Sequence, residues 1–242
     1  MALAKNIAVL YHIFYEDIMD HIIEELSPLS YYQPFFFFNI NAETPNANEI
    51  KTFLSQHFQQ SVITISSNKG KDIGGKLTLL NICQQMGLQP DWFIFLHDKK
   101  SLHAMNSKTW KADLQAIINT HNFTKIDLLI DQKDCGIIAA HNYVHSELRE
   151  GEKFTSKNGP ILDELLELYK LPLKNYQYVA GTMFWAKAKP IMDFFTTFNL
   201  LPIRQTLEEG NVIDNYQGSH THSWERLLSW VVTSKGLKIQ TV

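Results

Sequence analysis

The sequence has little cysteine and no long run of charge of one sign. Its two cysteines among 242 residues, Cys83 and Cys135, lie in apolar stretches and lack the spacing of metal ligands. Buried free thiols of this kind are typical of a reducing compartment. The formal net charge is -3, which argues against a general nucleic-acid binder but leaves room for a local basic pocket.

The pattern of a membrane span or a secretory leader is also missing. No apolar window approaches the length that crosses a bilayer, and the first apolar run is too short for a signal peptide. We therefore expect a cytoplasmic protein, with contact at the inner face of the membrane left open. Hydrophobic residues make up 45% of the chain and no repeat or linker stands out, so we expect a single domain over 1–242.

Strand patterns alternate with helix patterns along the chain. Short apolar or β-branched runs predict strands, which lie at 6–10, 35–38, 61–65, 92–96, 135–139 and 178–186. Apolar residues at helical spacing predict helices, which lie at 16–26, 48–58, 76–86, 107–118, 161–169, 191–198 and 224–232. This alternation predicts an α/β fold with a mainly parallel sheet and flanking helices.

A dense set of polar groups follows the apolar run at 92–96 directly. These residues are His97, Asp98, Lys99, Lys100 and Ser101. Ligands of open α/β sheets bind in the crevice outside the carboxyl ends of the strands. Two lysines and a histidine at such an edge favour an anion site, although a charged turn that caps a core strand would give the same pattern.

A glycine-rich, charged segment lies between the predicted strand at 61–65 and the helix at 76–86. Its candidate ligand-binding residues are Asn68, Gly70, Lys71 and Asp72. Glycine lets the backbone approach a ligand closely, and helix N-terminal amides favour negative charge. The segment matches neither a Walker loop nor a dinucleotide fingerprint. A simple turn followed by a helix cap explains it equally well.

Four stretches in order resemble the rhamnan synthesis protein F family. They read HIFYEDIMDHIIEEL, NKGKDIGG, FLHDKKS and AGTMFWAKA, and the likeness extends from about residue 12 to 230. The family comprises bacterial glycosyltransferase-like proteins of cell-surface polysaccharide assembly, lipopolysaccharide included. The resemblance implies a GT-A-like nucleotide-diphospho-sugar transferase fold. It also implies a donor such as dTDP-rhamnose and a glycan acceptor, which can be lipid-linked.

The resemblance and the strand-edge pattern together indicate the donor site. Donor-binding candidates are His12, Asn68, Gly70, Lys71, Asp72, His97, Lys99, Lys100 and Ser101. Asp72 is better suited to a sugar or ribose hydroxyl than to a phosphate, because like charges repel. Its alternative role is to cap the helix that follows.

Metal use is left open by one departure from the family pattern. The family has His-Thr-Lys-Lys-Ser after this strand, whereas Asp98 stands here in the threonine position. Many GT-A enzymes hold Mg²⁺ or Mn²⁺ with an Asp-x-Asp pair, and only one carboxylate is present. Either lysines neutralise the diphosphate without metal, which we favour, or Asp98 joins His220 or His222 in a metal site. These histidines share a face if their segment is extended.

The acceptor side has its own candidates. Glu225, near the start of the last predicted helix, is the expected general base, with Asp214 in reserve. Glu225 would equally fit as a first-turn residue favoured by the helix dipole. Gly181, Thr182 and Trp185 suggest a close backbone approach and an aromatic platform for the sugar, although core packing explains them as well.

These observations predict an inverting glycosyltransferase that uses a nucleotide-diphosphate sugar, a rhamnosyltransferase if the resemblance extends to the donor. The alternative is a non-catalytic glycan- or nucleotide-binding module on the same fold. A phosphate-ester hydrolase or nucleotidyltransferase would need paired carboxylates for two metals, and the sequence does not show them.

Overall fold

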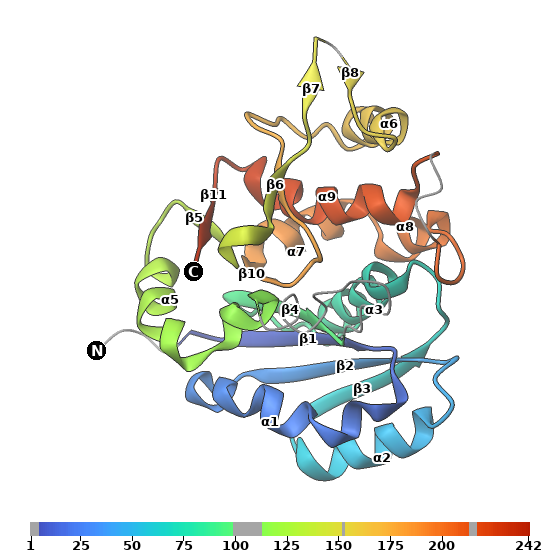
Figure 1. The fold of residues 1–242 in the computed structure, drawn as a ribbon, viewed down its shortest axis with the longest axis vertical. Helices are drawn as coiled ribbons and strands as arrows, with labels where there is room; N and C mark the ends of the chain where they lie inside the picture. The colour runs from blue at the N-terminus through green and yellow to red at the C-terminus, as the bar shows by residue number, and fades with distance from the viewer. Residues whose placement is uncertain (1–4, 99–112, 152, 213–216) are drawn as a thin grey trace.

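Seven strands form the central sheet in the order β11-β5-β10-β4-β1-β2-β3 (Figure 1). The structure is a computed structural model that describes residues 5–98, 113–151, 153–212 and 217–242. The strands of this sheet are β1 (Ile7–Ile13), β2 (Phe35–Asn41), β3 (Ser61–Ser66), β4 (Trp92–His97), β5 (Cys135–Ala139), β10 (Phe184–Lys187) and β11 (Lys238–Thr241).

The sheet is mainly parallel, as predicted. β1 lies parallel between β2 and β4, β3 extends the sheet beyond β2, and β11 is parallel to β5. β10 is the exception, because it runs antiparallel to both β4 and β5. The predicted strand at 178–186 is therefore divided: β9 (Gln177–Val179) pairs with β6 (Val144–Ser146) in a separate small sheet, and only β10 joins the central one.

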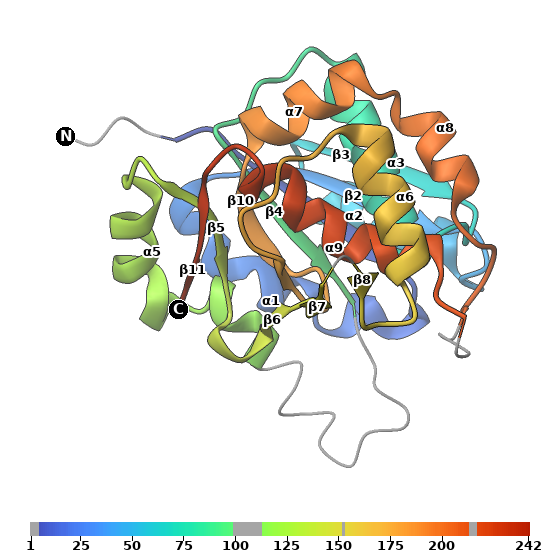
Figure 2. The ribbon, with the colours of Figure 1, turned by 90° about the horizontal axis from the view of Figure 1, so that it is seen from above.

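Helices cover both faces of the sheet. They are α1 (Ile22–Leu26), α2 (Ala47–His57), α3 (Lys71–Gln85), α5 (Phe123–Ile130), α6 (Gly159–Tyr169), α7 (Ala188–Thr197), α8 (Leu200–Thr206) and α9 (His220–Thr233). Figure 1 shows α1 and α2 below β1–β3, and α3, α7 and α9 above the sheet. Figure 2, which views the molecule from above, shows that α6 lies on the same side of the sheet as α3, α7 and α9. In the same view α5 lies beside the edge of the sheet formed by β5 and β11.

Several predicted helices differ in their bounds. α3 begins at Lys71, five residues before the predicted start at 76, so the glycine-rich segment from Lys71 onward lies within the helix. The segment at 16–26 forms a 3₁₀ turn, Glu16–Asp20, before α1, and His21 between them has φ -141°, which is outside the helical range. The last helix begins at His220, four residues before the predicted start, because Ser219 Oγ accepts from the His222 amide and caps it. Part of the predicted helix at 107–118 lies outside the described residues.

The core is centred on β1 and β4, all of whose residues are buried. A continuous apolar run had predicted this for β4, since a strand covered on both faces needs no alternation. Among the described residues, no helix combines the length and the apolar character that crossing a bilayer requires.

Candidate functional site

A row of polar side chains crosses the sheet near the carboxyl ends of its parallel strands. Asn39 of β2 pairs in register with His12 of β1, and His12 pairs with His97 of β4. Residues in register project from the same face of a sheet. That face is covered by α3, because a Cβ added to Gly75 of α3 would lie 2.2 Å from His12 Nδ1.

His12 is a buried, neutral member of this row. Its Nδ1 lies 2.9 Å from Asn39 Nδ2, and because the amide nitrogen only donates, Nδ1 accepts and the proton is assigned to Nε2. Burial lowers the pKa of His12 to about 4, against the opposing charge of Asp72. His12 therefore supports the packing of α3 and supplies no positive charge to a diphosphate near neutral pH.

Lys76 connects the row of Asn39, His12 and His97 to Asp72 and Thr182. It was not among the site residues predicted from the sequence. Its side chain is fully buried in α3. Its Nζ lies 2.9 Å from Asp72 Oδ2, 3.1 Å from His97 Nδ1, and 2.8 and 2.5 Å from the carbonyl and hydroxyl oxygens of Thr182. Burial lowers the pKa of Lys76, and the carboxylate of Asp72 opposes this shift. The available signal was the four-residue spacing from Asp72, which places both on one helix face.

Asp72 is ionised and keeps part of its surface in solvent. Its Oδ2 accepts hydrogen bonds from Lys76 Nζ and Thr182 Oγ1, and 23% of its side chain is exposed. Burial alone would raise the pKa of Asp72. The charge of Lys76, with smaller effects of His97 and the Thr182 hydrogen bond, holds it well below the ordinary value. The capping alternative is wrong, because the N-cap of α3 is Gly70 and no side chain caps it.

The turn between β9 and β10 is held in an unusual conformation. Gly181 has φ +77° and Thr182 has φ +51°, and Thr182 is 2% exposed. A left-handed conformation is uncommon for a β-branched residue and costs on the order of 1–3 kcal/mol. The Lys76 contacts to both oxygens of Thr182 hold this conformation, and the turn directs the Gly181 amide to Glu225.

Glu225 receives a hydrogen bond on each of its oxygens. The Gly181 N–H donates to Oε1 at 2.7 Å, and Arg226 Nη1 donates to Oε2 at 2.6 Å. Arg226 Nε in turn lies 3.1 Å from Glu147 Oε2. Because α9 begins at His220, Glu225 lies beyond the first turn, so the first-turn alternative is wrong. Its side chain is 20% exposed.

The glycine-rich segment packs against a later loop. The Gly70 N–H donates to the Glu208 carbonyl at 2.8 Å, and the Gly210 N–H donates to the Asn68 carbonyl at 3.0 Å. Gly70 has φ +76°, and a Cβ there would meet the Leu207 side chain at 2.2 Å. Position 70 therefore requires glycine, both for its left-handed backbone and for the close packing of Leu207. The Gly70 amide is already hydrogen-bonded to the Glu208 carbonyl. This corrects the expectation that the Gly70 backbone cradles a phosphate.

The other residues predicted in this segment lie near the start of α3. Asn68 is 2% exposed, and its Nδ2 donates to Glu43 Oε2 at 2.9 Å. Lys71 is the first residue of α3 and has φ +51°. Both remain candidates for donor binding.

Asp98 is bound by backbone amides of the segment after β1. Its Oδ2 accepts from the Tyr15 N–H at 2.7 Å, and both its oxygens lie 2.9 Å from the Phe14 nitrogen. It is 6% exposed. These hydrogen bonds join the segment after β1 to the end of β4, which gives Asp98 a structural role. Metal binding by Asp98 stays a prediction.

The C-terminal histidines do not share a face. Both lie in α9, where residues two apart point in different directions. The His220 N–H donates to Glu208 Oε1, and His222 Nδ1 lies 2.6 Å from Ser219 Oγ. Among the described residues, no group of three or more histidine, cysteine or acidic side chains has the arrangement of a metal site. The segment is helical and not extended, so the condition under which His220 and His222 would share a face is not met.

Trp185 is part of the core. It is fully buried, and its indole Nε1 donates to the Ile117 carbonyl at 2.8 Å. This corrects the expectation of an aromatic platform for a sugar.

Four other predicted site residues lie outside the described ranges, namely Lys99, Lys100, Ser101 and Asp214.

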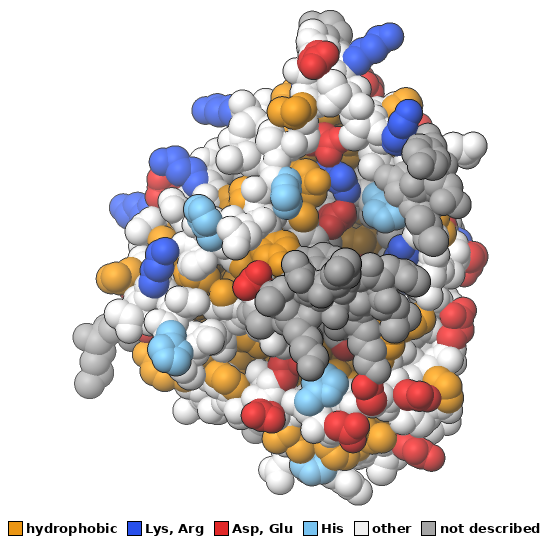
Figure 3. Space-filling view, in the orientation of Figure 1, with side chains coloured by type: hydrophobic (Ala, Val, Ile, Leu, Met, Phe, Trp, Pro, Cys, Tyr) orange, Lys and Arg blue, Asp and Glu red, His pale blue; other side chains and the backbone are white. Residues whose placement is uncertain are grey.

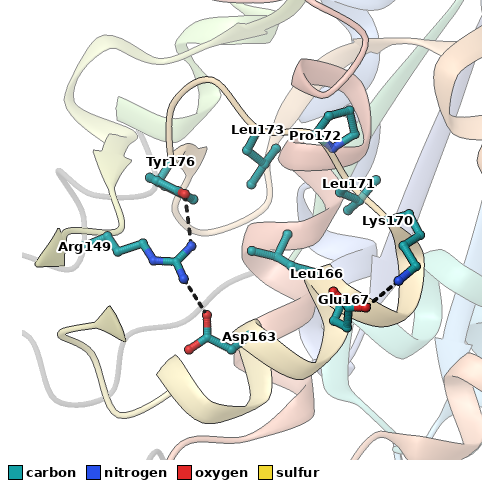
Figure 4. Close-up of a pocket in the computed structure, with 9 residues that line it drawn as sticks. All are labelled: Arg149, Asp163, Leu166, Glu167, Lys170, Leu171, Pro172, Leu173 and Tyr176. Carbon is teal, nitrogen blue, oxygen red and sulfur yellow. Dashed lines mark hydrogen bonds and ion pairs between the residues drawn. The ribbon is translucent and has the colours of Figure 1, made fainter. Parts of the chain in front are cut away.

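A hollow lies apart from these residues. It has a volume of about 600 Å³ and lies between α6, the segment after it and the start of β7 (Arg149–Glu150), as Figure 4 shows. Arg149 lines it, with hydrogen bonds of 3.1 Å to Tyr176 Oη and to Asp163 Oδ1. None of the predicted site residues lines it.

Side chains of both charges are interspersed on the face drawn in Figure 3. Its lower part, over α1 and α2, carries mainly acidic side chains. The part of this face that is visible shows no broad basic surface, in keeping with the charge balance of the sequence.

The fold and the site define a mainly parallel α/β protein with a polar site at the carboxyl edge of its sheet, which is consistent with a GT-A-like fold. The profile of the family described as rhamnan synthesis protein F matches residues 1–237, so the chain belongs to this family. Membership implies a glycosyltransferase-related role in rhamnan synthesis, with sugar nucleotides and glycan acceptors as partners in general terms. A search of curated proteins finds no match.

Proposed function

We propose that the protein is a glycosyltransferase that moves a sugar from a nucleotide-diphosphate donor to a surface polysaccharide or lipid-linked glycan. We propose dTDP-rhamnose as the donor, inversion at the anomeric carbon, and action in the cytoplasm at the inner face of the membrane. The observation that supports transfer is the convergence of two carboxylates, Asp72 and Glu225, at the carboxyl edge. They come from α3 and α9 and are joined through Lys76 and the turn at Gly181 and Thr182.

On the donor side, Asp72 accepts a hydroxyl of the sugar or of the ribose. It is ionised and partly exposed, and Lys76 and Thr182 occupy only its Oδ2. Each carboxylate oxygen can accept more than one hydrogen bond. The diphosphate is assigned to Lys99, Lys100 and Ser101, which follow β4 in the sequence.

On the acceptor side, Glu225 acts as the general base. The acceptor oxygen attacks the anomeric carbon on the face opposite the diphosphate while its proton passes to a Glu225 oxygen. The bond from the anomeric carbon to the diphosphate oxygen breaks, and its electron pair leaves with the nucleoside diphosphate. The two hydrogen bonds from Gly181 and Arg226 fix the carboxylate in one orientation, as proton transfer in the transition state requires.

Glu225→Gln tests this assignment. Glutamine keeps the shape of the side chain and cannot take the proton, so transfer should fall by about 10²- to 10⁴-fold. Donor binding, measured by titration calorimetry, should stay at the wild-type level. Glu164→Gln, on the exposed face of α6, is the matched control and should retain wild-type transfer. Wild-type transfer by Glu225→Gln would reject Glu225 as the base.

A thermal-shift panel identifies the donor. UDP, dTDP and GDP are each added with and without Mg²⁺ or Mn²⁺, and with a chelator. A ligand that binds only the folded state raises the melting temperature. We expect the largest shift with dTDP. If the protein binds glycan and shows no turnover with sugars of these three nucleotides, a non-catalytic binding module is the better description.

A further inference from the structure

We propose that Lys76 is a positioning residue that couples the donor-side carboxylate of Asp72 to the orientation of Glu225 through the Gly181–Thr182 turn. The inference rests on the proposed function, because it concerns how the proposed base is placed. Lys76 makes no hydrogen bond to Glu225, and the two side chains interact only through their opposite charges. It acts through hydrogen bonds that connect α3, β4 and α9.

The burial of Lys76 indicates more than a packing role. An ammonium group is costly to remove from water, and an apolar side chain of similar volume often stabilises a protein better than a buried ion pair does. Lys76 nevertheless has no exposed surface, and its Nζ lies among oxygens of Asp72 and Thr182 and a nitrogen of His97. These contacts place one charge where three segments of the chain meet.

The contacts of Lys76 determine the shape of the turn. Its Nζ lies within hydrogen-bond distance of both the carbonyl and the hydroxyl of Thr182, and that hydroxyl donates to Asp72. Thr182 would not adopt its left-handed conformation without such restraints. The conformation sets the direction of the preceding peptide, whose Gly181 N–H donates to Glu225 Oε1.

The other side of Glu225 is fixed separately. Arg226 Nη1 donates to Oε2, and Glu147 holds Arg226 from the opposite side. Loss of Lys76 would therefore release one of the two restraints on the carboxylate. A donor hydroxyl that binds Asp72 would join the hydrogen-bond network of Asp72, Lys76 and Thr182. Occupancy of the donor site and the orientation of Glu225 are therefore coupled.

The Gly181 amide reports on this coupling without any turnover. An amide proton that donates to a carboxylate resonates downfield of one that donates to a neutral group. In proton–nitrogen correlation spectra, Glu225→Gln should move the Gly181 resonance upfield, and Lys76→Met should move it in the same direction. Lys189→Met is the matched control, because it breaks an exposed ion pair at the same four-residue spacing in α7. It should leave the Gly181 resonance in place.

Turnover supplies the second readout. Lys76→Met should lower kcat by about 10²-fold, since small misplacement of a catalytic group has an effect of this size. Its KM for the donor should rise by a smaller factor than kcat falls, because Asp72 loses one of its partners whereas the nucleotide and diphosphate contacts remain. A KM effect that exceeds the kcat effect would overturn the proposal and assign Lys76 to donor binding.

Folding is checked by circular dichroism before each comparison. If Lys76→Met does not fold, Lys76→Gln replaces it, and failure of both variants to fold would assign Lys76 a structural role and reject the proposal. A folded variant with an unmoved Gly181 resonance would also reject it. If wild-type protein transfers no sugar, the proposed function fails, and the amide resonance still decides whether Lys76 positions Glu225.

Discussion

Buried, neutral His12 should make the stability of the fold depend on pH in a defined window. Its folded pKa is about 4 and its ordinary value is 6.5, because burial disfavours the charged imidazole. Between these values the unfolded state binds more protons than the folded state, so stability falls as the pH falls. From about pH 7 to about pH 4.5, His12 should account for about 2 kcal/mol of lost unfolding free energy.

Urea unfolding followed by tryptophan fluorescence measures this loss. His12→Asn keeps an acceptor near the Nδ1 position and removes the titration, so its unfolding free energy should fall by about 2 kcal/mol less than that of wild type over the same pH range. Exposed His121 is the matched control, and His121→Asn should follow wild type. The reasoning is refuted if His12→Asn and wild type lose the same stability between the two pH values.

Two further substitutions test the packing that places the site. Gly75→Ala should destabilise the fold by roughly 1–3 kcal/mol in urea unfolding, because the new Cβ would overlap the His12 side chain. This overlap outweighs the gain in helix propensity of about 1 kcal/mol. Equal or higher stability of the variant would show that α3 can shift. Glu208→Ala should cost about 1 kcal/mol, because its carboxylate accepts from the His220 and Thr221 amides at the start of α9. Unchanged stability of Glu208→Ala would show that water satisfies the His220 and Thr221 amides in place of the carboxylate.

The sheet could be predicted because its signal is local. Alternating strand and helix patterns over the first hundred residues allow few topologies other than a parallel sheet, and β4 follows from one apolar run. The direction of β10 could not be predicted in this way, since an apolar strand of four residues has the same composition in either orientation. The turn between β9 and β10 contains Gly181, and a glycine inside a predicted strand is the local signal for such an interruption.

The candidate site was predicted only in its location. Glycines that admit a ligand and glycines that admit a neighbouring element both require a missing side chain, so Gly70 could not be assigned from the sequence. Lys76 was missed because the helix was predicted to begin at 76, which left Asp72 outside it. Even within one helix, an aspartate and a lysine four residues apart ordinarily form a pair on an exposed face. Its burial depends on Thr182, more than a hundred residues away, and such a contact leaves no local pattern.

The distribution of charge at the carboxyl edge narrows how a diphosphate can be held. A leaving diphosphate needs positive charge placed before the reaction begins. Among the described residues of this edge, Lys76 and Arg226 each bind a carboxylate, and Arg204 donates to backbone carbonyls. Further positive charge can come from Lys71 at the start of α3, from Lys99 and Lys100, or from a divalent cation. A donor-induced thermal shift that survives chelation therefore assigns neutralisation to lysine side chains, and a shift that chelation removes assigns it to the cation.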